Sequence, residues 1–565
     1  MADARKIDPK SGFCSVTRIY HNLRPPAPLP PLSQPISITE YAISLLRATT
    51  SSPTSTTSPS TPFLIDCSTG CQLSYSQFFS QVHSLSTFLL TQYPSLSQND
   101  VAFILCPPSL HVPVLYFSLL SLGLTVSPAN PLSSPSELTH LLQLSKPAVV
   151  FTISSLYQKF PKALKSSMIF VDKPQFQSVL SNHTSTEKIE AVSKYSGRVI
   201  HQNDSAAILY SSGTTGRVKG VELSHRTLIA VIAGLYHNKH KADGEDENPP
   251  HPVSLFSLPL FHVFGFFMLI RAAALGETLV LLGKFDFENM LEAIERYKVT
   301  YMPVAPPLVV AFAKSDIVNK YDLSSLRLLG CGGAPLGKEV SESFTARFPN
   351  VEISQGYGMT ETGGAATRMI GTEEIKKHGS TGRLAEHTEA KIVDPDTKEA
   401  LPPGQRGELW LRGPIIMKGY VGDSQATAET WDSEGWLKTG DLCYFDSDGF
   451  LYIVDRLKEL IKYKAYQVPP AELEHLLQSI PEVADAAVIP YPDEEAGQIP
   501  MAFIVRKPGS HVTETQIMDI VAKQVAPYKK IRRVAFISSI PKSPAGKILR
   551  RELVNHAISA ASSKL

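Results

Sequence analysis

Residues 209–220 bring together chemical groups that bind phosphate. They read Leu-Tyr-Ser-Ser-Gly-Thr-Thr-Gly-Arg-Val-Lys-Gly. Their glycines free the backbone to curl, so that amide N–H groups, hydroxyls and one ammonium can surround a polyphosphate. The residues that would supply these groups are Ser211, Ser212, Gly213, Thr214, Thr215 and Lys219. A Ser/Gly-rich surface turn is the alternative interpretation.

This segment is not a Walker A loop. That pattern requires Gly directly before the Lys and Ser or Thr directly after it. Here Val218 and Gly220 flank Lys219. The pattern therefore disfavours an ordinary P-loop ATPase or kinase.

A second segment, Gln355 to Glu361, has the features of a nucleotide site. Glycines on both sides of Tyr357, the first of them Gly356, let the backbone pass close to a flat ring. Thr360 can bind a phosphate oxygen, and Glu361 can hold Mg²⁺. Taken alone, the segment could equally be a strand-end turn with a solvated carboxylate.

Three further polar positions fit the same nucleotide. Asp441 follows a Gly turn and could bind two ribose hydroxyls, although such an Asp is often only part of the turn. The cations between Asp455 and Lys464 could instead form an exposed face. Lys547 lies on a loop stiffened by Pro and Gly, where most lysines are merely solvated.

Composition excludes several classes of function. The 565 residues carry a net charge of +1, which argues against nucleic acid as a partner. Six cysteines occur without a metal-like CxxC pair, which favours a reducing compartment without disulfides. We expect neither a secretory signal nor a membrane span. The final Ser563-Lys564-Leu565 is a peroxisomal address, which makes an import receptor an expected partner.

Apolar runs alternate with amphipathic stretches, which predicts an α/β fold. We expect a domain over 1–456, with a smaller β subdomain from Ala390, and an α+β domain over 457–565. Segments 49–62 and 239–252 should be mobile or exposed loops. Strands are expected at 101–105, 148–151, 278–282, 326–329, 390–393, 407–412, 450–454, 486–489 and 501–505, and helices at 287–297, 471–478 and 514–525.

The order of these segments resembles the adenylate-forming superfamily of acyl-CoA synthetases, luciferases and peptide-synthetase adenylation domains. The resemblance runs from Ile38 to Leu553 and is strongest to plant 4-coumarate–CoA ligases. It is carried by residues 258–262 (Leu-Pro-Leu-Phe-His), 332–339 (Gly-Gly-Ala-Pro-Leu-Gly-Lys-Glu) and 458–474. With the terminal Ser-Lys-Leu, the chain is most similar to the peroxisomal ligase-like branch.

The resemblance implies a large N-terminal domain, a smaller mobile C-terminal domain and a reaction in two halves. A carboxylate attacks the α-phosphate of ATP, and the thiol of coenzyme A then displaces AMP from the acyl-adenylate. By resemblance, ATP or AMP contacts the 211–219 loop, Gly333, Ala334, Gln355, Gly356, Tyr357, Thr360, Asp441 and Arg456, while Glu361 holds Mg²⁺ and Lys547 reaches the α-phosphate.

The same resemblance implies that the small domain swivels about Lys458 for the second half. Lys462 and Gln467 would then contact the adenylate, and Lys284, Lys464 and Ala465 would contact coenzyme A. His262 would be a gate or the acceptor of the thiol proton, with a packed histidine as the alternative. Two departures are Val218 for the usual Pro, and Ala465 for the usual Gly.

The expected acyl wall carries no charged side chain, which favours an apolar acid. It comprises Phe261, Phe264, Phe266, Phe267, Met268, Gly332, Gly363, Gly364, Ala365, Ala366 and Met369. Phe264 stands where hydroxycinnamate ligases have Tyr, so a partner for a ring hydroxyl is missing. We therefore expect medium- or long-chain fatty acids, or a jasmonate precursor such as 12-oxo-phytodienoic acid, ahead of 4-coumarate. Less favoured alternatives are a luciferase-like oxygenase and an inactive nucleotide-binding protein; we expect a monomer.

Overall fold

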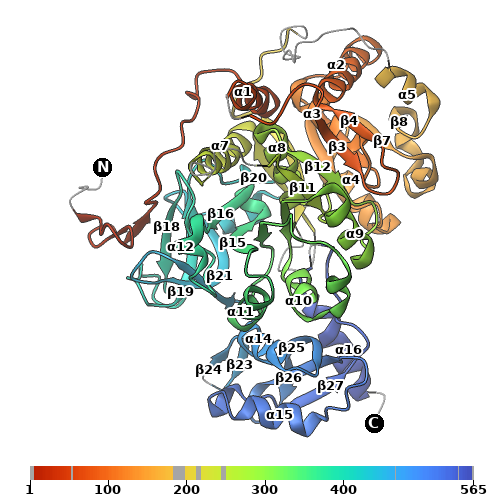
Figure 1. The fold of residues 1–565 in the computed structure, drawn as a ribbon. Coiled ribbons are helices and arrows are strands. Elements are labelled where there is room, and N and C mark those ends of the chain that lie inside the picture. Colours follow the sequence, from red (N-terminus) through yellow and green to blue (C-terminus); the bar gives the residue numbers. More distant parts are fainter. Residues whose placement is uncertain are drawn as a thin grey trace.

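The computed structural model describes residues 6–52, 55–181, 197–211, 218–242, 250–464, 466–544 and 546–562. A large lobe built from three sheets lies above a small lobe formed by the C-terminal segment (Figure 1). Residues 212–215, Ala465 and the terminal Ser-Lys-Leu lie outside the described residues. In the described part of the chain, no helix is both long and apolar enough to cross a membrane.

Two sheets form the centre of the large lobe, and both have parallel cores. One runs β17 (Arg383–Leu384), β16 (Gly364–Arg368), β15 (Glu352–Met359), β14 (Leu328–Cys331), β13 (Tyr301–Val304), β11 (Val253–Phe256), β12 (Thr278–Leu281), β3 (Pro62–Asp66), β4 (Gln72–Ser74). The other runs β20 (Gly419–Tyr420), β10 (Lys219–Ser224), β9 (Ser205–Ser211), β6 (Thr125–Pro128), β5 (Val101–Leu105), β7 (Val149–Thr152), β8 (Met168–Phe170).

A third, antiparallel sheet completes the large lobe, and a fourth forms the small lobe. The third runs β1 (Phe13–Cys14), β2 (Ile19–His21), β18 (Glu389–Val393), β19 (Gly407–Arg412), β21 (Leu437–Phe445), β22 (Leu451–Arg456). The fourth runs β24 (Tyr466–Val468), β23 (Ile461–Tyr463), β26 (Gly497–Arg506), β25 (Val483–Asp493), with β27 (Arg533–Phe536) beside β26. The boundary expected at 456/457 falls between β22 and β23.

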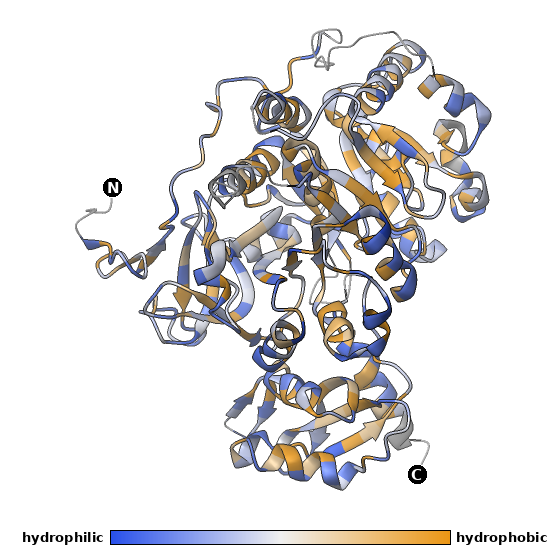
Figure 2. Cartoon of the chain, viewed as in Figure 1, coloured by the Kyte–Doolittle hydropathy of each residue, from blue (hydrophilic) through white to orange (hydrophobic). Residues whose placement is uncertain are grey.

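Helices cover the sheets, and apolar residues concentrate on the strands and the helix faces against them (Figure 2). Helix α8 (Val263–Leu275) is apolar on nearly all sides because it packs between α1 (Ile38–Thr50) and α7 (His225–Ala242). The other helices are α2 (Tyr75–Gln92), α3 (His111–Ser121), α4 (Pro135–Ser145), α5 (Pro174–Ser181), α9 (Phe287–Tyr297), α10 (Pro306–Lys314), α11 (Lys338–Arg347), α12 (Gly371–Ile375), α13 (Ser424–Thr430), α14 (Pro470–Ser479), α15 (Glu514–Ala522) and α16 (Arg550–Ser562).

Most of the expected elements are present, with shifts of a few residues at their ends. The strand expected at 326–329 is β14, which starts later because its pairing with β13 begins at Leu328. The loop expected at 239–252 was wrong in its first residues, since α7 continues to Ala242. Within the segment 49–62, which was expected to be mobile, Thr57 is instead anchored: it is buried, and its hydroxyl donates to Gly276 O at 2.7 Å.

Candidate active site

The two lobes enclose a cavity of about 1240 Å³. Its walls come from the carboxyl ends of parallel strands in the large lobe, from the loop after β14, and from the small-lobe loop that carries Lys547. Open α/β sheets place their ligands at this edge. The described residues expected to bind nucleotide all line this cavity: Ser211, Lys219, Gly333, Ala334, Gln355, Gly356, Tyr357, Thr360, Glu361, Asp441, Arg456 and Lys547.

Glu361 anchors one end of the cavity. Its Oε1 accepts hydrogen bonds from Tyr420 Oη at 2.9 Å and Ser211 Oγ at 3.1 Å. Lys219 Nζ lies 4.3 Å from the centroid of the Tyr420 ring. Among the described residues, both bonds use one carboxylate oxygen, and the other oxygen is open to a cation. Because Mg²⁺ is typically bound by one or two carboxylates together with substrate phosphates, this geometry fits magnesium at Glu361.

Asp441 lines the cavity from β21. Its Oδ2 accepts a hydrogen bond from Tyr357 Oη at 2.6 Å, and its Oδ1 lies 3.7 Å from Arg456 Nε. Burial raises the pKa of Asp441, and the Arg456 charge opposes this shift. The tyrosine and the arginine therefore hold the carboxylate in one orientation.

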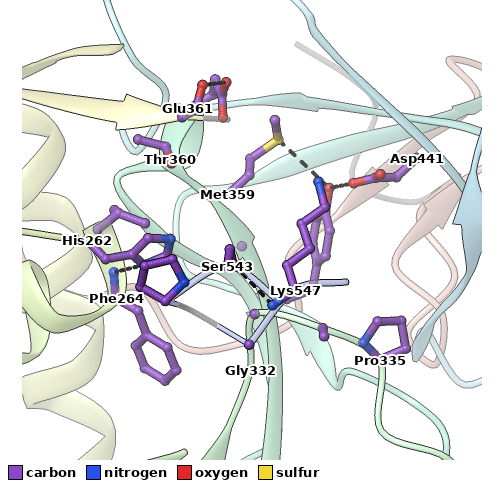
Figure 3. A pocket seen from close by; sticks show the side chains of 18 of the residues that line it. His262, Phe264, Gly332, Pro335, Met359, Thr360, Glu361, Asp441, Ser543 and Lys547 are labelled. Carbon is purple, nitrogen blue, oxygen red and sulfur yellow. Dashed lines mark hydrogen bonds between the residues drawn. The ribbon is translucent and has the colours of Figure 1, made fainter. Parts of the chain in front are cut away.

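Lys547 reaches into the cavity from the small lobe, and its side chain extends toward Asp441 (Figure 3). The loop is folded by Ser543, whose Oγ accepts from the Lys547 N–H at 3.2 Å. It packs closely on the large lobe: a Cβ on Gly546 would lie 3.0 Å from Ala305 Cβ. Burial, and then the Arg456 charge, lower the pKa of Lys547 to about 8.

His262 is the N-cap of α8. Its Nδ1 accepts from the Phe264 N–H at 3.4 Å (Figure 3), and burial lowers the pKa of the ring to about 4. The imidazole is therefore neutral near pH 7, with its lone pair at Nδ1 already in use. Its hydrogen must then sit on Nε2, which makes the ring a hydrogen-bond donor to the cavity.

The expected acyl wall is only partly at the cavity. Phe261, Phe264, Phe267, Met268, Gly332, Gly364 and Ala365 line it. Phe266, Gly363, Ala366 and Met369 do not, and were wrong as wall residues. Phe266 lies on the other face of α8, 5.2 Å from the Tyr116 ring. Gly363 has φ +61°, and a Cβ there would meet Thr227 Cγ2 at 2.6 Å, so it faces away.

The residues expected to serve the second half-reaction lie elsewhere in this structure. Lys462 and Gln467 face each other across β23 and β24, and both are exposed. Lys464 pairs with Glu495 at 2.7 Å, and Lys284 is exposed on the large lobe. These four residues do not line the cavity, whereas the expected hinge Lys458 does.

Three positions at the cavity or between the lobes escaped the sequence patterns. Tyr420 bonds Glu361, which lies 59 residues earlier in the chain. Lys314 donates to backbone oxygens of the small lobe that lie more than 160 residues later in the chain. Arg368 lines the cavity and is not among the residues expected for the acyl wall. The only sequence signal for Arg368 was its place five residues after Gly363, inside the segment already assigned to the wall.

Comparisons with known proteins agree with this fold and site. The AMP-binding enzyme model matches residues 53–421, and the model of the AMP-binding enzyme C-terminal domain matches residues 472–547. The chain belongs to the AMP-binding enzyme family. Within it, the chain is an acid–thiol ligase of the CoA ligase group, as its curated relatives indicate.

Two relatives from Arabidopsis thaliana match along their whole length. "4-coumarate--CoA ligase-like 9" is 57% identical, with 100% of this chain and 99% of the relative covered. "Peroxisomal OPC-8:0-CoA ligase 1" is 43% identical, with coverage of 99% and 100%. Among solved structures, o-succinylbenzoate CoA synthetase from Bacillus subtilis with its acyl-adenylate intermediate has a TM-score of 0.74 at 26% identity, covering 92% of this chain and 98% of that one.

Proposed function

We propose that this enzyme joins an apolar carboxylic acid to coenzyme A through an acyl-adenylate, using ATP and Mg²⁺. The observation that carries the proposal is the position of Lys547, which projects from the small lobe between the nucleoside end at Asp441 and the acyl end of one cavity. A cation there faces the α-phosphate and the attacking carboxylate, where negative charge gathers in the first half-reaction.

In that half, the substrate carboxylate oxygen bonds to the α-phosphorus and pyrophosphate leaves. Asp441 and Arg456 bind the ribose, and Thr360 and Lys547 bind α-phosphate and carboxylate oxygens. The 211–219 loop holds the phosphates that leave, through Ser211, Lys219 and residues outside the described part. Magnesium, held by Glu361, supplies charge neutralisation on the phosphates.

In the second half, the thiol sulfur attacks the acyl carbonyl carbon and AMP leaves. We propose that the small lobe rotates about Lys458 for this step, bringing Lys462 and Gln467 to the adenylate and Lys464 toward coenzyme A. The exposure of Lys462 and Gln467 away from the cavity supports a second pose. Because the Nδ1 of His262 is occupied, the geometry favours this residue as a donor that orients the acyl group over an acceptor of the thiol proton.

The acid we propose is a medium- or long-chain fatty acid or a jasmonate precursor such as 12-oxo-phytodienoic acid. Phe264 stacks on Phe267, with ring centroids 5.6 Å apart, and provides no hydroxyl for a phenolic substrate. Gly364 and Ala365 also line the cavity, and their small side chains leave space for an acyl chain. The relative named an OPC-8:0-CoA ligase is consistent with this class, and hydroxycinnamates are the alternative.

The terminal Ser-Lys-Leu supports a peroxisomal location through an import receptor. A fluorescent fusion that keeps the C-terminus free should be peroxisomal, and deletion of the last three residues should release it. An unchanged distribution after the deletion would contradict this assignment.

The test of function is pyrophosphate release across carboxylic acids, with and without coenzyme A. We expect release without coenzyme A in a single turnover, and AMP and thioester together when it is added. Lys547→Ala should slow acyl-adenylate formation far more than thioester formation from supplied adenylate. Failure of every acid to release pyrophosphate would exclude the proposed function. A large preference for 4-coumarate would contradict the proposal that fatty acids or a jasmonate precursor are preferred over hydroxycinnamates.

A further inference from the structure

The strands β9 and β10 lead into and out of the loop expected to hold the phosphates. Ser211 at the end of β9 pairs with Lys219 at the start of β10, and Tyr210 pairs with Gly220. Val218 comes directly before Lys219 and so lies beyond the paired residues. Because Lys219 carries the ammonium of this loop, a group that fixes the backbone of Val218 also fixes the base of that lysine.

Helix α4 supplies a hydrogen bond to this backbone. His140 Nε2 lies 2.8 Å from the carbonyl oxygen of Val218, which is 78 residues later in the chain. A carbonyl oxygen can only accept, so Nε2 must carry the hydrogen and donate it. His140 also lines the cavity, and the bond is partly buried. The ring therefore anchors the chain where the loop rejoins the sheet.

The same helix contacts the other arm of the loop. Tyr210 Oη lies 2.7 Å from Ser127 Oγ and donates more weakly, at 3.4 Å, to Leu141 O, which is next to His140 on α4. The side chains of Tyr210 and Val218 pack against one apolar cluster that includes Leu141. Helix α4 therefore holds both arms at the neck of the loop.

Helix α4 is itself firmly held, as an element that positions a binding group must be. Its N-terminus is closed by a capping box, in which the Ser134 N–H donates to Glu137 Oε2 at 2.7 Å and the Glu137 N–H donates to Ser134 Oγ at 3.3 Å. Leu138 on its inner face is fully buried. Just before the helix, Lys159 Nζ donates to Ser133 O at 2.9 Å. The ring of His140 therefore projects from a fixed base.

The opposite side of the neck is tied to the end of the cavity at Glu361. Ser211 Oγ donates to Glu361 Oε1 at 3.1 Å, and Lys219 Nζ lies 4.3 Å from the centroid of the Tyr420 ring. His140 acts from the other side and through the backbone. The ammonium of Lys219 is thus placed twice, at its tip by Tyr420 and at its base by His140.

We propose that His140 is a positioning residue for the two phosphates of ATP that leave as pyrophosphate. By holding the Val218 carbonyl, it keeps Lys219 where those phosphates bind, so that less order has to be created when ATP arrives. This inference rests on the proposed role of the 211–219 loop. Because His140 acts through that loop, it matters for ATP and not for AMP, which lacks the β and γ phosphates.

The test measures the dissociation constants of Mg-ATP and of AMP by calorimetry, with the full chain and without any acid. His140→Leu removes the donor and keeps a side chain of similar size. Its affinity for Mg-ATP should fall by about 5- to 10-fold, the factor expected for one partly buried hydrogen bond. Its affinity for AMP should stay within about twofold of the wild-type value, because AMP does not reach the loop.

Two further variants show whether the N–H donor is responsible. His140→Gln keeps an N–H close to the position of Nε2 and should recover most of the lost affinity for Mg-ATP. His111→Leu is the matched control: this histidine bonds Gln177 and lies outside the cavity, so both affinities should stay at the wild-type values.

Three results would overturn the role of His140. One is wild-type affinity for Mg-ATP in His140→Leu, and another is the same loss in His140→Gln as in His140→Leu. The third is loss of Mg-ATP and AMP binding together in both His140→Leu and His140→Ala, since the residue would then act on the fold and not on the loop.

These measurements need neither an acid nor coenzyme A, which separates them from the ligase function. If the variants behave as expected but no acid releases pyrophosphate, the ligase function is overturned and the role of His140 in binding ATP stands. If pyrophosphate is released but His140→Leu binds Mg-ATP like the wild type, this proposal is overturned and the ligase function stands. A wild-type protein that binds no Mg-ATP overturns both.

Discussion

Lys314 connects the two lobes in the pose described above. It is the last residue of α10 in the large lobe, and its Nζ donates to Gln478 O at 2.7 Å and to Val483 O at 2.9 Å, both in the small lobe. The first turn of α10 follows Ala305, which packs against the loop of Lys547. Replacing Lys314 with Met should therefore weaken the pose that places Lys547 in the cavity.

The size of the effect follows from the two bonds. A hydrogen bond from a charged group contributes about 1.5–3 kcal/mol when it is buried. Because Lys314 is only half-buried and the freed carbonyls can bond water, we take about 2 kcal/mol for both bonds together. At about 1.4 kcal/mol for each factor of ten, the adenylate-forming pose should lose about 30-fold in relative population.

The assay separates the two half-reactions. Single-turnover pyrophosphate release should slow by up to about 30-fold in Lys314→Met, since only the adenylate-forming pose requires these bonds. Thioester formation from supplied acyl-adenylate should be unchanged or faster. Lys320→Met, which removes an exposed lysine nearby, should affect neither rate. Equal losses in both half-reactions, or no loss in the first, would refute a role for Lys314 in holding this pose.

Three further predictions concern single groups. Burial lowers the pKa of Lys547 to about 8, so the ammonium is lost as pH rises through that value, and single-turnover pyrophosphate release should decline above about pH 8. Tyr420→Phe removes the hydroxyl that orients Glu361 and should raise the Mg²⁺ concentration for half-maximal rate about 10-fold. Gly330→Ala would place a Cβ 2.3 Å from the Tyr301 hydroxyl and should lower the free energy of unfolding in urea by about 1–3 kcal/mol.

Two of these predictions have a control variant, and the pH prediction has an outcome that would contradict it. Gly283→Ala should leave the free energy of unfolding nearly unchanged, because a Cβ there meets no atom within 4 Å. Tyr444→Phe, in β21 but outside the cavity, should leave the magnesium requirement unchanged. A pyrophosphate-release rate that keeps rising above about pH 9 would show that deprotonation of Lys547 does not limit the first half-reaction.

Local patterns predicted the elements whose signal is carried by neighbouring residues. Helix α9 was expected at 287–297 and is present there, because its apolar residues recur at helical spacing. The strand at 101–105 was expected and is present, because a short apolar run suits a buried parallel strand. The same reasoning failed at Thr57, whose burial depends on a partner, Gly276, that lies 219 residues away.

That the residues expected to bind nucleotide line one cavity was predictable, because they stand in short, ordered segments such as 355–361. The acyl end was not, because position within a segment does not fix which way a side chain faces. Phe264 and Phe266 are two residues apart on one helix and point to different places, one into the cavity and one toward Tyr116.

The orientation of the small lobe is the feature most remote from any local pattern. The sequence places two lysines expected to act at the site in that lobe, Lys462 near its start and Lys547 near its end. Of these two, Lys547 lines the cavity here and Lys462 does not. Contacts from the large lobe decide which one, through Lys314 and through the close packing of Gly546 on Ala305. Another contact between the lobes is also polar, since the Ala471 N–H donates to Asp455 Oδ2 at 2.9 Å. Polar contacts suit the proposed rotation of the small lobe, since a large apolar interface would hold one pose too tightly.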